Sequence, residues 1–378
     1  MSIITTLLKW RAICWRMLSK YLIIAAIASR AYVQAATQAG FTVIAIDAFC
    51  DVDTQKIAQK VLQVTLENGQ FVAKDFYHAL STLNLSNAMG VCIGAGFEAS
   101  TTILQYLADQ NLLISTSINS ILQVKNPHSF FAFCDAVKMR YPATQLTRPA
   151  STIGWLQKQI GGSGGSHVKA VLPLDLAQSS THYYQKLQAG KPYSCLFLAD
   201  AKHAQVIGFN EQWCEPTTIL PYRFGGAVSH ADVDVSIKDC IIDFINEATL
   251  HFGLTGINSC DFLLHDNRVF MLEINPRLSA SLQLYQANKG NLFAAHVQAC
   301  MGKLKEWPTI EKSSRAMHII YANKIASVPH AMAWPQWVSD IPHYGSEIPA
   351  GAPICTVMAS ALSAKMAKQK VLQRAASL

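Results

Sequence analysis

A short apolar run near the start of the chain constrains the fold most. Residues 22–28 are all apolar. Such a run is too short and too apolar for a surface helix, so it predicts a strand buried on both faces. A helical stretch over 30–39 follows and ends at Gly40, and residues 41–46 predict a second buried strand. Because this order is a βαβ unit, it predicts a parallel sheet with a right-handed crossover.

The loop after the first strand argues against a dinucleotide site. Ala28, Ser29 and Arg30 stand where a GxGxxG loop would be needed. Further along, residues 91–94 predict another strand, and a helix follows it. Residues 21–122 therefore predict a small open α/β domain without a dinucleotide fingerprint.

The densest glycine cluster of the chain lies at 161–166, directly after a strand-like run over 155–160. Glycine and serine richness is typical of a flexible linker between domains. The cluster is short, however, and strand-like residues flank it at once. That arrangement suits a hairpin whose backbone amides cover phosphates. The segment alone leaves both interpretations open.

Two further strands are predicted near the middle of the C-terminal half. A helical pattern over about 231–252 ends at Gly253, and apolar strand patterns follow at 256–264 and 268–274. A turn at 265–267 joins them, which predicts a hairpin.

This hairpin carries oxygen-bearing side chains in apolar surroundings. Glu273 and Asn275 lie two apart on one strand, so they project from the same face, and Asp261 can face them across a hairpin. Three oxygen ligands without His or Cys describe a magnesium site that also uses phosphate oxygens and water. Arg277 follows, placed to reach an anionic phosphate or carboxylate. The alternative is a hairpin whose polar residues face solvent, which fits poorly with the apolar runs around them.

Here the sequence resembles a known family. The segment 258–285, with its Glu-x-Asn-Pro-Arg element at 273–277, resembles the metal-binding end of the ATP-grasp superfamily. Lys158 and the glycine cluster resemble that superfamily's strand lysine and flexible phosphate-covering loop. Stretches that resemble the subfamily of predicted ATP-dependent carboligases are 47–54, 208–213 and 351–357.

The resemblance implies an α/β fold, in which an N-terminal open parallel-sheet domain precedes a two-lobed ATP-grasp domain of α+β type. The predicted parts are a basic extension at 1–20, an α/β domain at 21–122, an ATP-grasp domain at 123–300 with its glycine-loop lobe at about 150–215, and a C-terminal segment at 301–378 that completes the fold. Prolines punctuate the last segment, which predicts loops, short strands and a final helix near 360–376.

The resemblance also implies roles for individual residues. Arg277 would stabilise the transferring phosphoryl group, and Lys158 would contact the ATP phosphates. The implied nucleotide-binding residues are Lys125, Lys158, Gly162, Ser163, Gly164, Gly165, Tyr184 and Gln185. The implied metal ligands are Asp261, Glu273 and Asn275. The chain departs from the family pattern in two places, because no obvious hinge glutamate stands near Tyr184 and an aspartate replaces the more frequent glutamate at 261.

The implied activity is an ATP-dependent ligase that needs Mg²⁺, with Mn²⁺ as an alternative ion. It would join a small-molecule carboxylate to an amine or a thiol through an acyl phosphate. The carboligase subfamily suggests an amide-forming step in the synthesis of a C1-carrier cofactor, and it allows a homodimer. Two other classes stay open: a catalytically silent nucleotide-binding regulator or scaffold, and a metal-carboxylate enzyme that does not use ATP. The second leaves Lys158 and the glycine cluster unexplained.

The substrate determinants are the least constrained. The loop 94–98 follows a strand, and ligands of open α/β sheets bind at such strand ends. A tight strand-to-helix turn explains its glycines equally well. The run 223–226 is a second candidate, and Ser279, Ser281 and Tyr285 are candidates for the acceptor side.

Composition excludes several other classes. The net charge is +7, but the basic residues are scattered, so nucleic-acid binding is not indicated. None of the ten cysteines forms a CxxC pair, which predicts buried thiols in a reducing cytoplasm. Residues 1–20 alternate apolar and basic residues and form neither a signal peptide nor a spanning helix. Weak contact with a membrane surface remains an alternative for them, without stable insertion.

Overall fold

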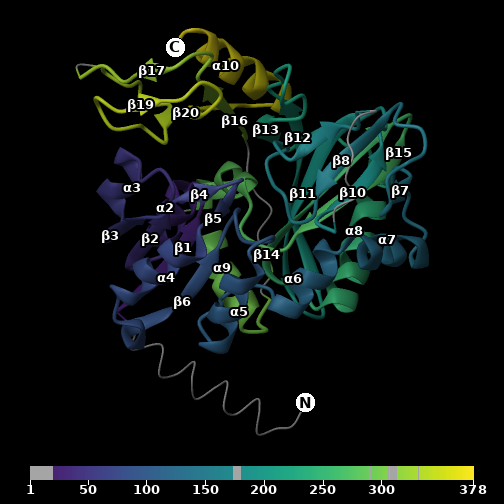
Figure 1. Ribbon diagram of the computed structural model, residues 1–378, viewed down its shortest axis with the longest axis horizontal. Helices are drawn as coiled ribbons and strands as arrows, with labels where there is room; N and C mark the ends of the chain where they lie inside the picture. The colour runs from purple at the N-terminus through teal and green to yellow at the C-terminus, as the bar shows by residue number, and fades with distance from the viewer. Residues whose placement is uncertain (1–19, 173–179, 289–290, 305, 307–312, 331) are drawn as a thin grey trace, which may run out of the picture.

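The computed structural model describes residues 20–172, 180–288, 291–304, 306, 313–330 and 332–378 (Figure 1). The predicted extension at 1–20 lies outside these residues except for Lys20. Within the described ranges, no helix combines the length and the apolar character that crossing a membrane requires.

The N-terminal part builds a four-stranded parallel sheet in the order β3-β2-β1-β6 (Figure 1). Its strands are β1 Tyr21–Ala26, β2 Val43–Asp47, β3 Lys60–Gln63 and β6 Ala88–Ile93. Side chains of β1 alternate between two cores: Ile23 packs in one, and Leu22 and Ile24 pack in the other. The prediction of a strand buried on both faces is therefore confirmed.

Helices cover both faces of this sheet. Helix α2 Arg30–Gln38 contributes Tyr32 and Val33 to one core, while α4 Ala73–Ser81 and α5 Thr101–Asp109 pack in the other. Smaller elements complete the unit: α3 Val52–Ile57, β4 Leu66–Glu67, β5 Gln70–Phe71 and η1 Leu85–Asn87.

A small antiparallel sheet follows, in the order β7-β10-β8-β9. Its strands are β7 Thr144–Gln145, β8 Trp155–Gln159, β9 Val168–Ala170 and β10 His182–Lys186. Two helices precede it, α6 Ile118–Lys125 and α7 Pro127–Ala136. This sheet forms one lobe over the larger sheet that carries the acidic hairpin (Figure 1).

The larger sheet has eight antiparallel strands in the order β15-β14-β11-β12-β13-β16-β20-β18. The strands are β11 Lys191–Asp200, β12 Ala204–Cys214, β13 Phe224–Ser229, β14 Thr255–His265, β15 Arg268–Asn275, β16 Ser314–Tyr321, β18 Val338–Ser339 and β20 Pro353–Ala361. Phe197 of β11 packs in the same core as residues of α8 Val235–Phe252, whereas Leu196 packs in the core that includes residues of α9 Asn291–Cys300. Helices thus lie on both faces, and β11 is buried throughout its centre.

The C-terminal segment is more regular than the sequence predicts. Strands β16 and β20 pair along their length inside the large sheet, and α10 Ala364–Ala376 packs on them. In the described part of this segment, β17 Ala326–Ser327 and β19 Glu347–Ile348 form a separate pair of short strands. Upstream, η2 Ala280–Asn288 precedes α9. The prolines at 329, 335, 342 and 349 fall in the connections, so they mark loops between real strands rather than a loop-rich tail.

This segment also folds back toward α2 and α3 of the N-terminal part (Figure 1). The Val52 amide donates to the Ile341 carbonyl over 2.9 Å. Arg30 of α2 pairs with Asp340, with 2.8 Å between Nε and Oδ1. The first and last parts of the chain are therefore joined by polar contacts, and together they contribute walls to one cavity.

Candidate functional site

Strands β14 and β15 form the predicted hairpin. Asp266 and Asn267 make its turn, both with positive φ, which these residue types tolerate better than most. The register places Asp261 opposite Glu273 and pairs position 275 with Ser259. The two acidic side chains therefore meet across the hairpin, as the spacing predicts.

The hairpin's oxygens gather around a lysine. The Lys125 Nζ atom, at the end of α6, lies 2.8 Å from Glu273 Oε2 and 2.7 Å from Asn275 Oδ1. The amide of Asn275 donates to Asp261 Oδ2 over 2.9 Å. Two carboxylates, one amide oxygen and one ammonium thus form a connected cluster. Across the described residues no group of three His, Cys, Asp or Glu side chains is assembled, so a metal here would depend on the amide oxygen as well.

The two carboxyl groups of the cluster differ in acidity. Burial raises the pKa of Asp261, and the adjacent charge of Glu273 raises it further. Burial acts on Glu273 in the same direction, but the charge and the hydrogen bond of Lys125 outweigh it and hold the pKa of Glu273 well below its usual value. A divalent cation would favour the ionised form of both groups, since it supplies the positive charge that Asp261 lacks.

The glycine cluster is a hairpin and not a linker between domains. Strands β8 and β9 on either side of it pair antiparallel, with Leu156 opposite Ala170. Gly161 has a φ of +71°, and a Cβ there would lie 2.7 Å from the Glu98 backbone. Gly165 has a φ of +73°, and a Cβ there would collide with the Tyr222 carbonyl. Both positions require glycine, because the loop is closely packed against neighbouring segments.

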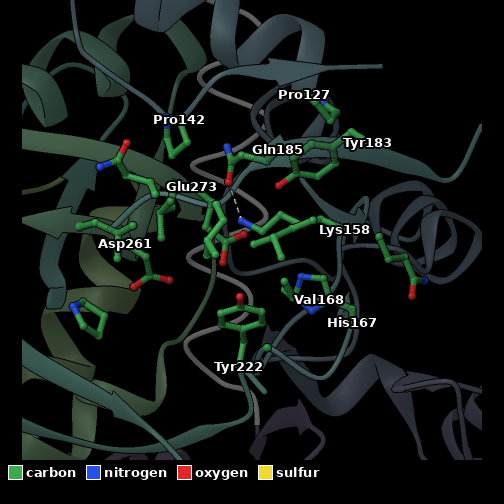
Figure 2. Close-up of a pocket in the computed structure, with 18 of the residues that line it drawn as sticks. Pro127, Pro142, Lys158, His167, Val168, Tyr183, Gln185, Tyr222, Asp261 and Glu273 are labelled. Carbon is green, nitrogen blue, oxygen red and sulfur yellow. Dashed lines mark hydrogen bonds between the residues drawn. The ribbon is translucent and has the colours of Figure 1, made fainter. Parts of the chain in front are cut away.

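Lys158 of β8 points toward Gln185 and Glu273 (Figure 2). Its Nζ donates to Gln185 Oε1 over 2.9 Å and lies 5.9 Å from the centre of the Tyr183 ring. Burial lowers the pKa of Lys158, while the charges of Glu273 and Asp261 act in the opposite direction. The lysine and the acidic hairpin therefore face the same space from opposite lobes.

A cavity of about 380 Å³ lies between these lobes. Lys125, Lys158, Gln185, Asp261 and Glu273 all line it, as do three of the loop glycines, 161, 164 and 165. Its other walls are largely apolar: Phe130, Phe131, Leu156, Val168, Leu263 and Leu272. The structure thus brings most of the predicted nucleotide and metal residues around one cavity.

Several predicted residues lie elsewhere. Tyr184 is buried on the face of β10 opposite to Tyr183 and Gln185, which line the cavity. Gly162 packs under the His167 ring, and Ser163 lines a second, larger cavity.

Arg277 lies on the second cavity rather than the first. It is buried, and its Nε donates to Glu98 Oε1. Glu98 is also buried, and its Oε1 is 3.9 Å from Lys125 Nζ. Arg277 therefore ties the loop after β6 to the end of β15, beside the oxygen cluster.

The second cavity has a volume of about 820 Å³. It opens beside Asp261, Glu273 and Asn275 and extends between the N-terminal sheet and the C-terminal strands. Of the candidate substrate residues, Ala95, Arg223, Phe224, Ser279 and Ser281 line it. Tyr285 does not, because its hydroxyl group donates to Asn210 Oδ1 over 2.7 Å inside the core.

Sequence reasoning missed several residues of the site. His167 lines the first cavity beside the glycines, and Gln212 of β12 lines both cavities and donates to Asp261 Oδ1 over 3.2 Å. The sequence offers only a weak signal for them. Gln212 is an amide inside a strand, and its neighbour across the sheet depends on strand order.

Comparison with known proteins identifies the family of the domain that contains this site. Residues 124–281 match the family described as the ATP-grasp domain. The chain therefore carries an ATP-grasp domain, and the resemblance seen in its sequence is confirmed.

Two solved structures share the fold over 94% of this chain. One is the biotin carboxylase domain of 2-oxoglutarate carboxylase from Hydrogenobacter thermophilus, in complex with MgADP, ADP and bicarbonate (10% identity, TM-score 0.71, 89% of that chain covered). The other is an L-amino acid ligase from Bacillus licheniformis (11% identity, TM-score 0.68, 97% of that chain covered). At identities this low, the likeness establishes the fold.

A sequence relative is an uncharacterized protein of Methanocaldococcus jannaschii. It is 24% identical over 53% of this chain and 50% of its own length. The chain thus spans about half the length of the curated relative it matches.

Proposed function

We propose that this protein is an ATP- and magnesium-dependent ligase that joins a carboxylate to an amine through an acyl phosphate. The observation that carries the proposal is that Lys158, Lys125, Asp261 and Glu273 converge on one cavity beneath a glycine hairpin, where Lys125 also donates to Asn275 Oδ1. The ATP-grasp domain over 124–281 supports it.

The smaller cavity suits a nucleotide. Its apolar walls, among them Leu156, Val168 and Leu263, offer surface for a purine ring. The basic end near Lys158 suits the phosphates, over which the hairpin can present backbone amides. Tyr183 and Gln185, which line the cavity, would contact the ring or ribose in place of Tyr184.

The oxygen cluster fits magnesium. Its carboxylate and amide oxygens are hard ligands, and Mg²⁺ binds through a few such groups together with substrate phosphates and water. Asp261, Glu273 and Asn275 would hold the ion, and Lys125 would share the charge of Glu273 with it. When bound, the ion would neutralise charge on the transferring phosphoryl group.

The residues of the chain would support two balanced steps. A substrate carboxylate oxygen attacks the γ-phosphorus of ATP, ADP leaves, and an acyl phosphate forms. An amine then attacks the acyl carbon, phosphate leaves, and the amine loses its proton. Lys158 and Arg277 would stabilise the charge of the first step, and the glycine hairpin would exclude water from the intermediate. A thiol acceptor would follow the same scheme.

Hydroxylamine capture tests the proposal. The protein is incubated with ATP, Mg²⁺ and a panel of small carboxylates, and released ADP and hydroxamate are measured. Because hydroxylamine reacts with acyl phosphates, we expect one carboxylate to give both products in equal amounts. Nucleotide binding without carboxylate-dependent ADP release across the panel would instead favour a silent regulator. The assignment to C1-carrier cofactor synthesis rests on the subfamily resemblance alone.

A further inference from the structure

The larger cavity contains a buried cation that the proposed chemistry does not use. Arg223 precedes β13 and is only 6% exposed, yet it lines this cavity. We propose that Arg223 binds an oxyanion of the substrate, a carboxylate or phosphate separate from the group that reacts. This inference rests on the proposed ligase function and specifies its substrate class.

The guanidinium of Arg223 is held in a fixed position. Its Nε donates to the Glu215 carbonyl over 3.0 Å, and its Nη1 donates to the Gly351 carbonyl over 3.3 Å. The Tyr321 ring packs against its flat face, with 3.7 Å to the ring centre. The Tyr321 hydroxyl is itself fixed on the Phe224 carbonyl over 2.7 Å. Such an arrangement pre-orients a planar group that binds oxyanions through two parallel hydrogen bonds.

Arg223 donates its hydrogen bonds to neutral backbone carbonyl groups, and these contacts do not balance its positive charge. Within the described part of the chain, no carboxylate forms an ion pair with it, and the Glu215 carboxylate instead lies 3.8 Å from His318. Arg277 lines the same cavity but pairs with Glu98, and Arg30 nearby pairs with Asp340. A buried charge without a counter-ion is costly, and an anionic ligand would supply one.

The position of Arg223 fits one substrate that spans the cavity. The cavity extends from Arg223 to Glu273 and Asn275, where the transferred phosphoryl group would lie. The adjacent Phe224 amide donates to the Gly164 carbonyl over 3.0 Å, so the arginine also neighbours the tip of the glycine hairpin. A substrate whose acidic group sits on Arg223 could therefore place a second group at the reacting end.

Two alternative roles for Arg223 make different predictions. In the first, Arg223 only ties β13 to the loop at Gly351, and its charge is irrelevant. In the second, it belongs to the nucleotide site and contacts ATP phosphates from beneath the hairpin. Substitutions of Arg223 that keep either the charge or a neutral hydrogen-bond donor distinguish both of these roles from an anion-binding site.

The experiment uses the full chain, with saturating Mg²⁺ and a non-hydrolysable ATP analogue to occupy the nucleotide site. Succinate and ethyl phosphate are titrated separately by calorimetry, and succinamide serves as the neutral probe. Arg223→Gln retains a hydrogen-bond donor without the charge, while Arg223→Lys retains the charge. Arg315→Met, at a position of β16 that does not itself line the cavity, is the control.

We expect one of the two anions to bind the wild-type protein and succinamide not to bind. Arg223→Gln should weaken binding of that anion at least tenfold. Arg223→Lys should lose less affinity than Arg223→Gln, because it keeps the charge but not the planar fork, and Arg315→Met should leave the affinity unchanged. Preference for succinate or for ethyl phosphate identifies the oxyanion as a carboxylate or a phosphate.

The proposal is overturned if neither anion binds, or if Arg223→Gln and the wild type bind it equally. It is also overturned if Arg223→Gln loses affinity for the ATP analogue while its affinity for the anion is unchanged. Separate titrations with the ATP analogue alone and with the anions alone distinguish the ligase hypothesis from the proposed role of Arg223. Failure to bind the analogue counts against the ligase, whereas failure to bind the anions counts only against the role of Arg223.

Discussion

The two cavities of this protein are built in different ways. The smaller one, beneath the glycine hairpin, takes its walls from residues between Val124 and Glu273, and two antiparallel pairs, β8–β9 and β14–β15, supply its glycine loop, Lys158, Asp261 and Glu273. The larger one takes its walls from segments that range from Ala26 to Thr356. The chemistry of the smaller cavity is therefore encoded locally, whereas the larger cavity depends on how the ends of the chain meet.

The two cavities also contain carboxyl groups whose pKa values are shifted in opposite directions. In the smaller cavity, Glu273 has a lowered pKa because Lys125 holds its negative charge against the effect of burial. In the larger cavity, burial raises the pKa of Asp51 to about 6, and the charge of Asp340 adds to this effect. Glu273 is thus held ionised beside lysines, as binding of a metal and phosphates would require, whereas Asp51 on the wall of the larger cavity titrates with a pKa of about 6.

The largest effect is expected at the oxygen cluster. Glu273→Gln removes the charge that Lys125 and a metal would share, so carboxylate-dependent ADP release should fall by about 10²–10³-fold. Asp266→Asn, on the exposed turn of the same hairpin, is the control and should leave the rate unchanged. Equal rates for both variants would remove Glu273 from the chemistry.

The second-largest effect is expected at Lys158, which faces the acidic hairpin across the smaller cavity. Lys158→Met should weaken binding of the magnesium–nucleotide complex by about 10- to 100-fold, because a charged hydrogen bond to phosphate is lost. Lys169→Met changes an exposed residue of the paired strand β9 and should bind nucleotide normally. Calorimetric titration of both variants makes the comparison, and unchanged affinity in Lys158→Met would contradict the placement of the phosphates.

The larger cavity predicts a dependence of stability on pH. Asp51 is protonated more readily in the folded state than in the unfolded state, so its contribution to the free energy of unfolding should fall as pH rises from about 4 to about 6. The loss should be about 2 kcal/mol relative to Asp51→Asn, measured by urea unfolding at pH 4.5 and 6.5. The exposed Asp109→Asn serves as a control. A difference between wild type and Asp51→Asn that stays constant with pH would show that Asp51 titrates normally.

The smallest effect is a difference in nucleotide binding between alanine substitutions at two glycines of the hairpin. Gly164 and Gly165 have similar φ values of +68° and +73°, but only at Gly165 would a Cβ meet the Tyr222 carbonyl. Both alanine variants carry backbone strain of about 1–2 kcal/mol. Gly165→Ala should therefore weaken nucleotide binding about fivefold more than Gly164→Ala, a difference of about 1 kcal/mol. Equal losses would show that the hairpin is not docked there when nucleotide binds.

The sequence predicts the smaller cavity well because its signals are local. Alternation along β14 and β15 places Glu273 and Asn275 on one face, and the short turn at Asp266 fixes their register against Asp261. The glycine cluster by itself is equally compatible with a linker and a hairpin. The antiparallel pairing of β8 with β9 shows that the cluster is a hairpin. Composition alone does not specify which strands pair.

The larger cavity is not readable from the sequence. The N-terminal part that supplies one of its walls meets the C-terminal segment at the Arg30–Asp340 pair, between residues 310 positions apart. No periodicity or motif specifies such a contact. For the same reason the sequence predicts a loop-rich C-terminal segment, since the partner strands of β16 and β20 are set by the order of the large sheet.

The most direct test of the central claim is a calorimetric titration of the wild-type protein with a non-hydrolysable ATP analogue, with and without Mg²⁺. The arrangement of Lys158, the glycine hairpin and the Asp261–Glu273–Asn275 oxygens predicts one binding site whose affinity depends strongly on magnesium. Absence of binding under both conditions would contradict the nucleotide site, and with it the ligase function.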